Sequence, residues 1–232
     1  MRANPGSPVT AEAGSHERSG WDVENDGVFG APQLTVVVGD EVHASLLKVL
    51  GRKRVIRVPA DEQGRMRADR LPALDDRCIV CIQAGYVNSG AFDPAAAICR
   101  RAREAGAWVH VDGAFGLWAA ASPQHRHLTE GFDLADSWAT DGHKWPNVGY
   151  DCGIAMVRNA AAMRAAMAIS AAYFIPGELR EPSNYTPEMS RRARRGVVGH
   201  AEIVGTPGPG GINRTDLPAC PAIRRGAARG RP

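Results

Sequence analysis

Short apolar runs rich in β-branched residues alternate with helical patterns along the middle of the chain. The runs that predict buried strands are 34–39, 54–59, 78–85, 107–113 and 152–158. The patterns that predict helices are 41–51, 93–106 and 160–170. Asp93 is expected to cap the start of the second helix, and Gly106 to follow its end. Such alternation predicts an α/β domain with a mostly parallel sheet flanked by helices.

The two ends of the chain lack this pattern. Residues 1–30 are rich in Gly, Ser, Pro and charge and predict an irregular lead-in, so the large domain is expected over 31–190. Residues 191–232 contain nine arginines, no lysine and no aromatic residue. Three interpretations stay open for this tail: a disordered segment, a stretch translated out of frame, or, least favoured, a nucleic-acid-binding arm.

Composition limits the functional classes. The chain has 232 residues, 44% hydrophobic and 23% charged, which is typical of a globular protein, and its net charge of +3 is too small to indicate nucleic acid or an anionic membrane as a partner. No apolar stretch is long enough for a membrane span and no secretory signal precedes the domain, so a cytoplasmic location is expected. Cys78 and Cys81 form a CxxC within an apolar run, and buried strand cysteines are favoured over a redox or zinc site.

The chemistry of an open α/β sheet gathers at the carboxyl ends of its strands. Lys144 follows such a position in SWATDGHKWPNVGYDCG, between His143 and Trp145. A lysine in apolar surroundings is unusual, and burial favours the neutral amine that adds to an aldehyde. A surface lysine at the end of a loop is the alternative.

Asp112 strengthens the interpretation of Lys144. It ends the run WVHVDG, 32 positions before Lys144. A carboxylate there can pair with a protonated pyridine nitrogen and keep a pyridoxal ring electron-accepting. Ala114 is small enough to let a flat ring lie against it. An aspartate that merely caps the next segment is the alternative.

The segments HVDGA, ADSWATDGHKW and YDCG together resemble the signature of the group II amino-acid decarboxylases, which depend on pyridoxal 5′-phosphate. The resemblance covers roughly residues 20–195 and implies the large domain of a fold-type-I pyridoxal-phosphate enzyme, incomplete at both ends. It implies that Lys144 forms a Schiff base with the cofactor and that Asp112 pairs with the pyridinium. Ala114 and His43 would lie on opposite ring faces, with His143 near the phosphate.

The resemblance also suggests less specific contacts. Ser137 and Asp141 match positions where the family places polar groups toward the phosphate, and the loop 88–90 offers further polar groups at a strand end. Tyr173 lies 29 residues after Lys144, at the spacing of a mobile-loop tyrosine that protonates the product carbanion. An aromatic side chain that packs a helix end is the alternative for Tyr173.

Arg191 and Arg192 match an arginine-rich segment beyond that loop, where one of them could meet a carboxylate, although a solvated basic patch is the alternative.

The implied reaction is decarboxylation of a small-molecule amino acid to an amine and CO2, in a homodimer, with no metal, nucleic acid or membrane involved. The chain is short for the family, and it departs from the pattern at Pro146 and Gly149. Two alternatives therefore remain: another fold-type-I pyridoxal-phosphate lyase, and a truncated remnant without catalytic activity.

Overall fold

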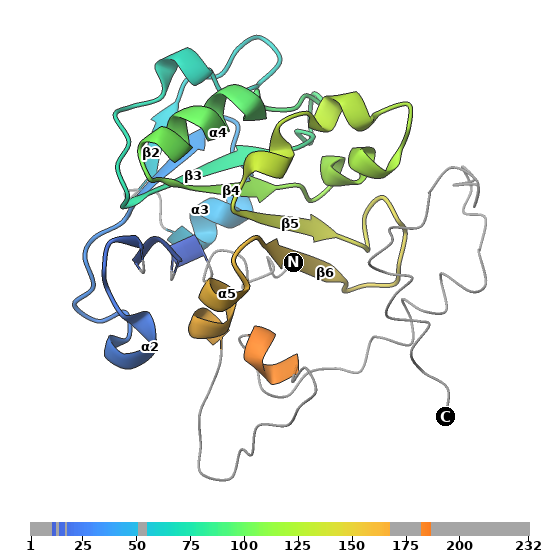
Figure 1. Ribbon diagram of the computed structural model, residues 1–232. Coiled ribbons are helices and arrows are strands. Elements are labelled where there is room, and N and C mark those ends of the chain that lie inside the picture. The colour runs from blue at the N-terminus through green and yellow to red at the C-terminus, as the bar shows by residue number, and fades with distance from the viewer. Residues whose placement is uncertain (1–10, 13, 17, 51–54, 168–181, 187–232) are drawn as a thin grey trace, which may run out of the picture.

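The computed structural model describes residues 11–12, 14–16, 18–50, 55–167 and 182–186. Within these residues the chain forms a six-stranded sheet in the order β2-β1-β3-β4-β5-β6 (Figure 1). The strands are β1 (Thr35–Gly39), β2 (Val55–Val58), β3 (Cys78–Gln83), β4 (Trp108–Asp112), β5 (Ser137–Asp141) and β6 (Gly153–Val157). The first five strands are parallel, and β6 pairs antiparallel with β5. The predicted α/β class with a mostly parallel sheet is confirmed.

Five of the six strands fall within the predicted runs, and β5 is the exception. Its sequence, SWATD, is short and mixes polar and aromatic residues, so it carries no continuous apolar signal. It becomes a strand because its backbone pairs on both sides, with β4 and with β6. Ser137 is the first residue of this strand, and Asp141 is the last.

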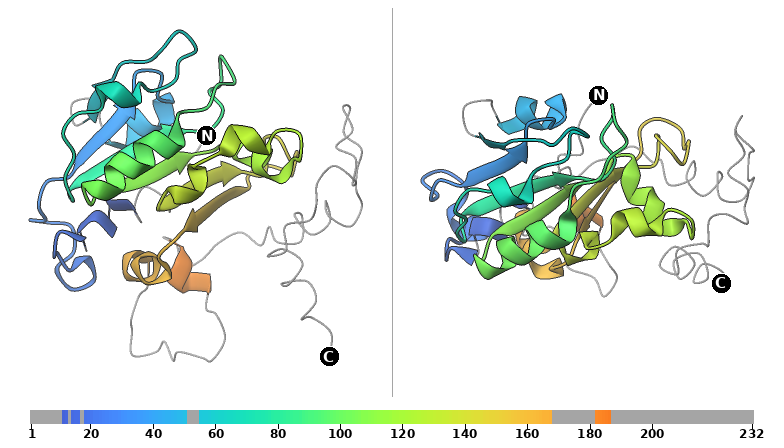
Figure 2. Two further views of the ribbon diagram at one scale, coloured as in Figure 1. Left: turned by 45° about the horizontal axis from the view of Figure 1, so that its top comes forward. Right: turned by 90° about the horizontal axis from the view of Figure 1, so that it is seen from above.

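Helices cover both faces of the sheet (Figure 2). The α-helices are α2 (Val23–Asp26), α3 (Ala44–Leu50), α4 (Ala95–Glu104) and α5 (Ala160–Met167), and the 3-10 helices are η1 (Ala68–Arg70), η2 (Gly116–Ala121), η3 (Arg126–Thr129), η4 (Phe132–Leu134) and η5 (Pro182–Tyr185). Helix α4 packs on one face through Ile98 and Ala102, in a cluster that includes Val80 and Val111. Helices α3 and α5 pack on the other face, around Trp108. Alternating side chains of the strands supply both cores.

The ends of α4 confirm one predicted cap and correct the other. Gly106 has φ +75°, and the N–H groups of Gly106 and Ala107 donate to the carbonyls of Arg103 and Ala102, which is a Schellman motif. At the other end the N-cap residue is Pro94, with no side-chain cap, so the predicted cap by Asp93 is wrong. The Asp93 carboxylate turns instead toward buried backbone N–H groups of other segments.

The lead-in is more ordered than its sequence predicts. The described residues among 11–18 include helical turns, and Ala11, Ser15 and His16 are buried. Gly14 lies directly against the Trp108 ring, since a Cβ atom there would be 2.1 Å from it. Packing against the sheet thus orders a segment that has no periodic pattern of its own. The tail 191–232 lies outside the described residues, so its domain boundary and its three interpretations stay predictions.

Two further findings concern the strand cysteines and the question of a membrane span. Cys78 and Cys81 are buried free thiols on β3, which confirms that they are strand cysteines. Among the described helices, none combines the length and apolar character that a membrane crossing requires.

Candidate functional site

The predicted site residues follow strands of the parallel sheet at one edge. His43 comes shortly after β1, Asp112 ends β4, and Asp141 ends β5. Because parallel strands point the same way, their carboxyl ends meet at this edge, which we call the carboxyl edge. Lys144 lies in the loop that leaves β5 and returns to the antiparallel β6.

Backbone hydrogen bonds close the loop that carries Lys144. The Gly142 N–H donates to the Cys152 carbonyl over 2.8 Å, and the Asn147 N–H donates to the Lys144 carbonyl over 3.0 Å. Asn147 adopts the left-handed conformation, with φ 56°, which asparagine tolerates better than most residues. The loop therefore holds Lys144 against the sheet.

The amine of Lys144 is paired and largely buried. Its Nζ lies 3.0 Å from Asp141 Oδ2, and the side chains of the two residues are only 13% and 19% exposed. The same Nζ lies 4.6 Å from the centre of the Phe115 ring, a cation–π contact. The prediction of a lysine in apolar and aromatic surroundings is confirmed, although Phe115 and not the 43%-exposed Trp145 supplies the aromatic face.

His143 is fixed by the same loop. Its Nδ1 accepts a hydrogen bond from the Cys152 N–H over 3.1 Å, and its ring packs against Tyr150 with 4.1 Å between centroids. Its Nε2 is buried and makes no hydrogen bond with the described residues, and Asp141 Oδ2 is 3.7 Å away. The imidazole therefore has one ring nitrogen still available at the carboxyl edge.

Asp112 lies within electrostatic reach of the other predicted residues. Burial raises the pKa of its carboxyl, while the hydrogen bond from the Ala114 N–H and the positive charges of Lys144 and His43 lower it, and Asp141 raises it. Asp112 Oδ1 accepts that hydrogen bond from Ala114 over 3.2 Å. His43 is held by its neighbour Ser45, whose hydroxyl lies 2.7 Å from Nδ1. The structure thus brings together charged groups from three strand ends, those of β1, β4 and β5.

Ser137 is not brought to this group. It is the first residue of β5 and lies at the amino end of the strand. Its hydroxyl is buried and accepts a hydrogen bond from Trp108 Nε1 over 2.8 Å, with His110 Nδ1 2.9 Å away. Ser137 therefore holds two side chains of β4 in the core, and it has no contact with the carboxyl edge.

The structure says less about the other predicted residues. Tyr173, Arg191 and Arg192 lie outside the described residues. The loop 88–90 is exposed, and the Ser89 hydroxyl accepts a hydrogen bond from the Ala91 N–H over 3.3 Å.

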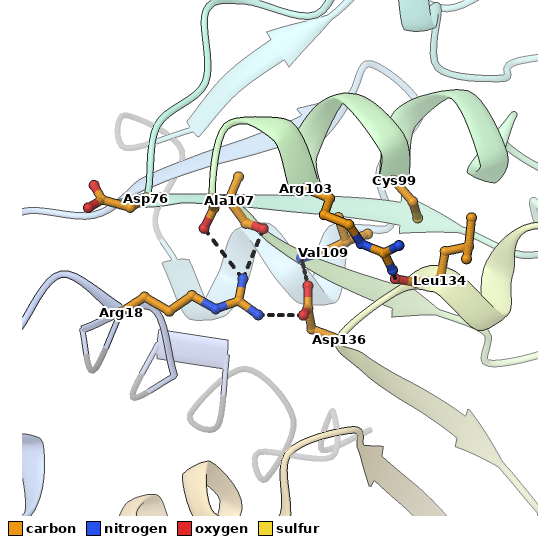
Figure 3. Close-up of a pocket in the computed structure, with 9 residues that line it drawn as sticks. Arg18, Asp76, Cys99, Arg103, Ala107, Val109, Leu134 and Asp136 are labelled. Carbon is orange, nitrogen blue, oxygen red and sulfur yellow. Dashed lines mark hydrogen bonds and ion pairs between the residues drawn. The ribbon is translucent and has the colours of Figure 1, made fainter.

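Two cavities lie at opposite edges of the sheet. One, of about 320 Å³, opens at the carboxyl edge beside Lys144 and is lined by Gly85, Tyr86, Val87, Gly90, Phe92, Phe115, Gly116 and Trp145. The other, of about 270 Å³, lies at the amino ends of β3, β4 and β5 (Figure 3). There Arg18 pairs with Asp136 over 2.5 Å and donates to the Ala107 carbonyl. The Arg18 guanidinium therefore already has partners within the protein. The first cavity meets the candidate site through Phe115, whose ring contacts the Lys144 amine, whereas Lys144 and Asp112 are not among the residues that line it.

Sequence reasoning missed two residues of the carboxyl edge. Phe115 contacts the lysine amine, and Gln83 is buried at the end of β3. Asp141 was predicted as a phosphate contact, and in the structure it is the counter-ion of Lys144. The pattern DGHK contains Asp141 but does not indicate which group the Asp141 carboxylate contacts. In the described part of the chain, no group of three or more His, Cys, Asp or Glu side chains has the geometry of a metal site.

Comparison with known proteins gives consistent sequence matches. The conserved-domain model described as "Pyridoxal-dependent decarboxylase conserved domain" matches residues 22–193. A glutamate decarboxylase-like protein of Gibberella zeae is 30% identical over 171 residues, 68% of this chain and 33% of that protein. Mouse cysteine sulfinic acid decarboxylase is 34% identical over 155 residues, 60% of this chain and 31% of that enzyme. The chain thus spans about a third of the length of these curated relatives.

Solved structures support the same assignment. The crystal structure of mouse CSAD superposes with a TM-score of 0.71 at 26% identity, covering 83% of this chain and 43% of that one. The crystal structure of Oryza sativa TDC with PLP and tryptamine has a TM-score of 0.66 at 24% identity, covering 79% of this chain and 41% of that one, and it supports the fold alone. The resemblance drawn from HVDGA and DGHKW is confirmed, and the chain belongs to the pyridoxal-dependent decarboxylase family.

Proposed function

We propose that this chain is the cofactor-binding part of an enzyme that decarboxylates an amino acid with pyridoxal 5′-phosphate. The observation that carries the proposal is that Lys144 and Asp112 meet at the ends of neighbouring strands. Asp112 is aligned with Ala139 on β5, and the Lys144 amine lies 3.0 Å from Asp141, the last residue of β5. Family membership adds that this pair lies within the matched residues 22–193.

The residues of the carboxyl edge fit the groups of the cofactor. Lys144 would hold it covalently through Nζ, and Asp112 would accept a hydrogen bond from the ring nitrogen. His43 and Ala114 would lie against its two faces, and the available Nε2 of His143 would meet a polar group of the cofactor. When bound, pyridoxal 5′-phosphate supplies an electron-accepting ring that stabilises the negative charge left on Cα as CO2 departs.

Lys144 and Asp141 control the proton at the reacting amine. The Lys144 ammonium lies 3.0 Å from Asp141 Oδ2, and an ammonium has no lone pair to add to an aldehyde. The proton must therefore leave Nζ before the amine reacts, and Asp141 is the nearest acceptor. We assign Asp141 the role of counter-ion of Lys144 in place of a phosphate contact.

Burial of Asp112 matters for the reaction as well. A carboxylate that is partly withdrawn from water interacts more strongly with a positive ring nitrogen than an exposed one does. Lys144 and His43 offset part of the cost of its ionisation. A bound pyridinium would add a further positive charge that favours the ionised form of Asp112.

Other parts of the proposal rest on the family. The substrate would be a small-molecule amino acid, the active assembly a homodimer, and Tyr173 the group that protonates Cα. Ser137 is left out, because its hydroxyl already has two partners in the core.

The test is covalent trapping. Purified protein is mixed with pyridoxal 5′-phosphate and reduced with borohydride, and the modified peptide is located by mass spectrometry. We expect the label on Lys144 in the wild type and in Lys48→Ala, a matched control on the exposed side of α3, and no label at that peptide in Lys144→Ala.

The same protein is then given labelled amino acids, and released CO2 is measured. Trapping together with CO2 release supports the decarboxylase. Trapping with a different product identifies another pyridoxal-phosphate lyase, and no labelling in the wild type shows that this chain does not hold the cofactor.

A further inference from the structure

The cavity at the carboxyl edge has an apolar lining. The described residues that line it are four aromatic residues, one valine and three glycines, and none of them carries a charge. The Tyr86 hydroxyl, which belongs to this lining, already donates to the Asp93 carboxylate over 3.0 Å. A ligand in the cavity therefore meets aromatic side chains and glycine backbone, and no cation among these residues.

Phe115 connects this cavity with the amine of Lys144. Its ring is part of the lining, and the ring centre lies 4.6 Å from Lys144 Nζ. Trp145, the residue after Lys144, belongs to the same lining. The amino group of a substrate would react where Nζ lies, and the side chain of an amino acid begins two bonds from its nitrogen. The substrate side chain would thus start within reach of Phe115.

The lining includes apolar side chains that stay open to solvent in the described part of the chain. Val87, Trp145 and Phe115 are 66%, 43% and 42% exposed. Exposed apolar groups that gather at one place mark a binding surface. The volume of about 320 Å³ lies at the lower end of the range for small-molecule sites, about 300–1,000 Å³, and suits a single ring-bearing side chain.

The absence of charge from this lining disfavours an acidic ligand. A carboxylate that enters an apolar cavity gives up hydration, and it needs a cation or hydrogen-bond donors in return. The group that binds the Tyr86 hydroxyl is the Asp93 carboxylate, which would repel a second negative charge. An aromatic ring would instead pack against Phe115 and Trp145, and such ring pairs gain more than the burial of their area.

We propose that this cavity holds the side chain of the substrate and selects an aromatic amino acid over an acidic one. The inference rests on the proposed function, because the substrate would react at Lys144. A second copy of this chain is the competing occupant of the same apolar surface, and the test below distinguishes the two.

The test uses stable ligands that carry the cofactor and one side chain in the same molecule. Borohydride reduction of pyridoxal 5′-phosphate with phenylalanine, leucine or glutamate gives three such adducts, and their binding needs no catalysis. Each is titrated into wild type, Val87→Arg and Val49→Arg, and the dissociation constant is measured by fluorescence of the reduced ring. Val49 lies on α3 and is 60% exposed, close to the 66% of Val87, so it is the matched control.

We expect the wild type to bind the phenylalanine adduct about tenfold to a hundredfold more tightly than the glutamate adduct, the effect of burying one phenyl side chain. The leucine adduct should bind with intermediate affinity, because it lacks the ring. Val87→Arg adds a cation to the lining and should strengthen the glutamate adduct about threefold. Val49→Arg should change no affinity. Trp145→Ala removes one ring and should weaken the phenylalanine adduct alone, which gives a second test if the arginine disturbs the fold.

Several results would overturn the proposal. Equal binding of the phenylalanine and glutamate adducts, or tighter binding of glutamate, refutes the selectivity, and equal binding of phenylalanine and leucine refutes the preference for a ring. A preference that neither Val87→Arg nor Trp145→Ala alters places the side chain elsewhere. If Val87→Arg weakens all adducts equally and sedimentation shows a monomer where the wild type is a dimer, the surface belongs to a second copy.

The proposed function fails in a different way. A wild type that binds neither pyridoxal 5′-phosphate nor any adduct refutes the proposed function and this inference with it. A wild type that binds pyridoxal 5′-phosphate but does not distinguish the adducts refutes the inference alone.

Discussion

Asp93 lies at the junction of three segments beneath the carboxyl edge. Its carboxylate accepts hydrogen bonds of 2.7 Å from the N–H groups of Met66 and Gln83, and the Tyr86 hydroxyl lies 3.0 and 3.1 Å from its two oxygens. All four residues are buried. Replacing Asp93 by Ala leaves these three donors without an acceptor, so it should destabilise the fold.

Two opposing effects set the magnitude. Each donor left unpaired costs about 1–3 kcal/mol, so the three lost hydrogen bonds are worth about 3–9 kcal/mol. Burial, however, raises the pKa of Asp93 from 3.8 to about 6, against the hydrogen bonds that lower it. At neutral pH the wild type therefore also bears the cost of an ionised buried carboxyl, which the variant escapes.

The raised pKa of Asp93 sets the direction in which folding stability changes with pH. The folded protein binds the Asp93 proton more tightly than the unfolded chain, so this contribution to stability is fully present below about pH 4 and is lost as the pH rises through about 6. Between pH 4.5 and pH 7.5 the loss amounts to about 2 kcal/mol. The stability gap between the wild type and Asp93→Ala should accordingly be about 2 kcal/mol larger at pH 4.5.

Urea unfolding followed by circular dichroism at both pH values measures the gap. Asp26→Ala, at an exposed position on α2, is the control and should track the wild type at each pH. A gap that does not change with pH, or that widens toward pH 7.5, would refute the reasoning about the buried carboxyl. A gap near zero at pH 4.5 would show that the three hydrogen bonds contribute little.

Three further predictions concern other parts of the sheet edge and core. Asp141→Asn should slow covalent trapping of pyridoxal 5′-phosphate on Lys144 severalfold at pH 7, because the amine loses the carboxylate that holds it and accepts its proton; an unchanged or faster reaction in a folded variant would contradict this. Gly116→Ala should destabilise the fold by about 3 kcal/mol in urea unfolding, since the new Cβ would lie 2.5 Å from the Ala84 carbonyl oxygen, and an unchanged midpoint would count against it. The Cys81 thiol, whose pKa burial raises to about 12, should resist iodoacetamide at pH 8 until the protein unfolds; peptide mapping that finds it alkylated in the native protein would disprove this.

Strand and helix positions could largely be predicted from the sequence. Runs such as 78–85 are continuously apolar because strands of a parallel sheet are buried on both faces, and this leaves a clear signal in the residue types. β5 lacked the signal, because three of its five residues are polar and its stability comes from pairing with two neighbours. The predicted Asp93 cap was wrong for a related reason. The Asp93 carboxylate accepts hydrogen bonds from buried N–H groups of distant segments, and these take the place of the local N–H groups at the start of α4.

The sequence by itself determined the α/β class, the family signature and the position of Asp112 after a strand-forming segment, because these depend on residue type and local order. Only the tertiary structure decided that Asp141 and Phe115 contact the lysine amine, that Ser137 faces the core, and that Gln83 is aligned with Asp112. Pairing register and the direction of a side chain depend on which strands become neighbours, and a one-residue change of register reverses the face. That information is distributed over the whole sheet, so no single motif contains it.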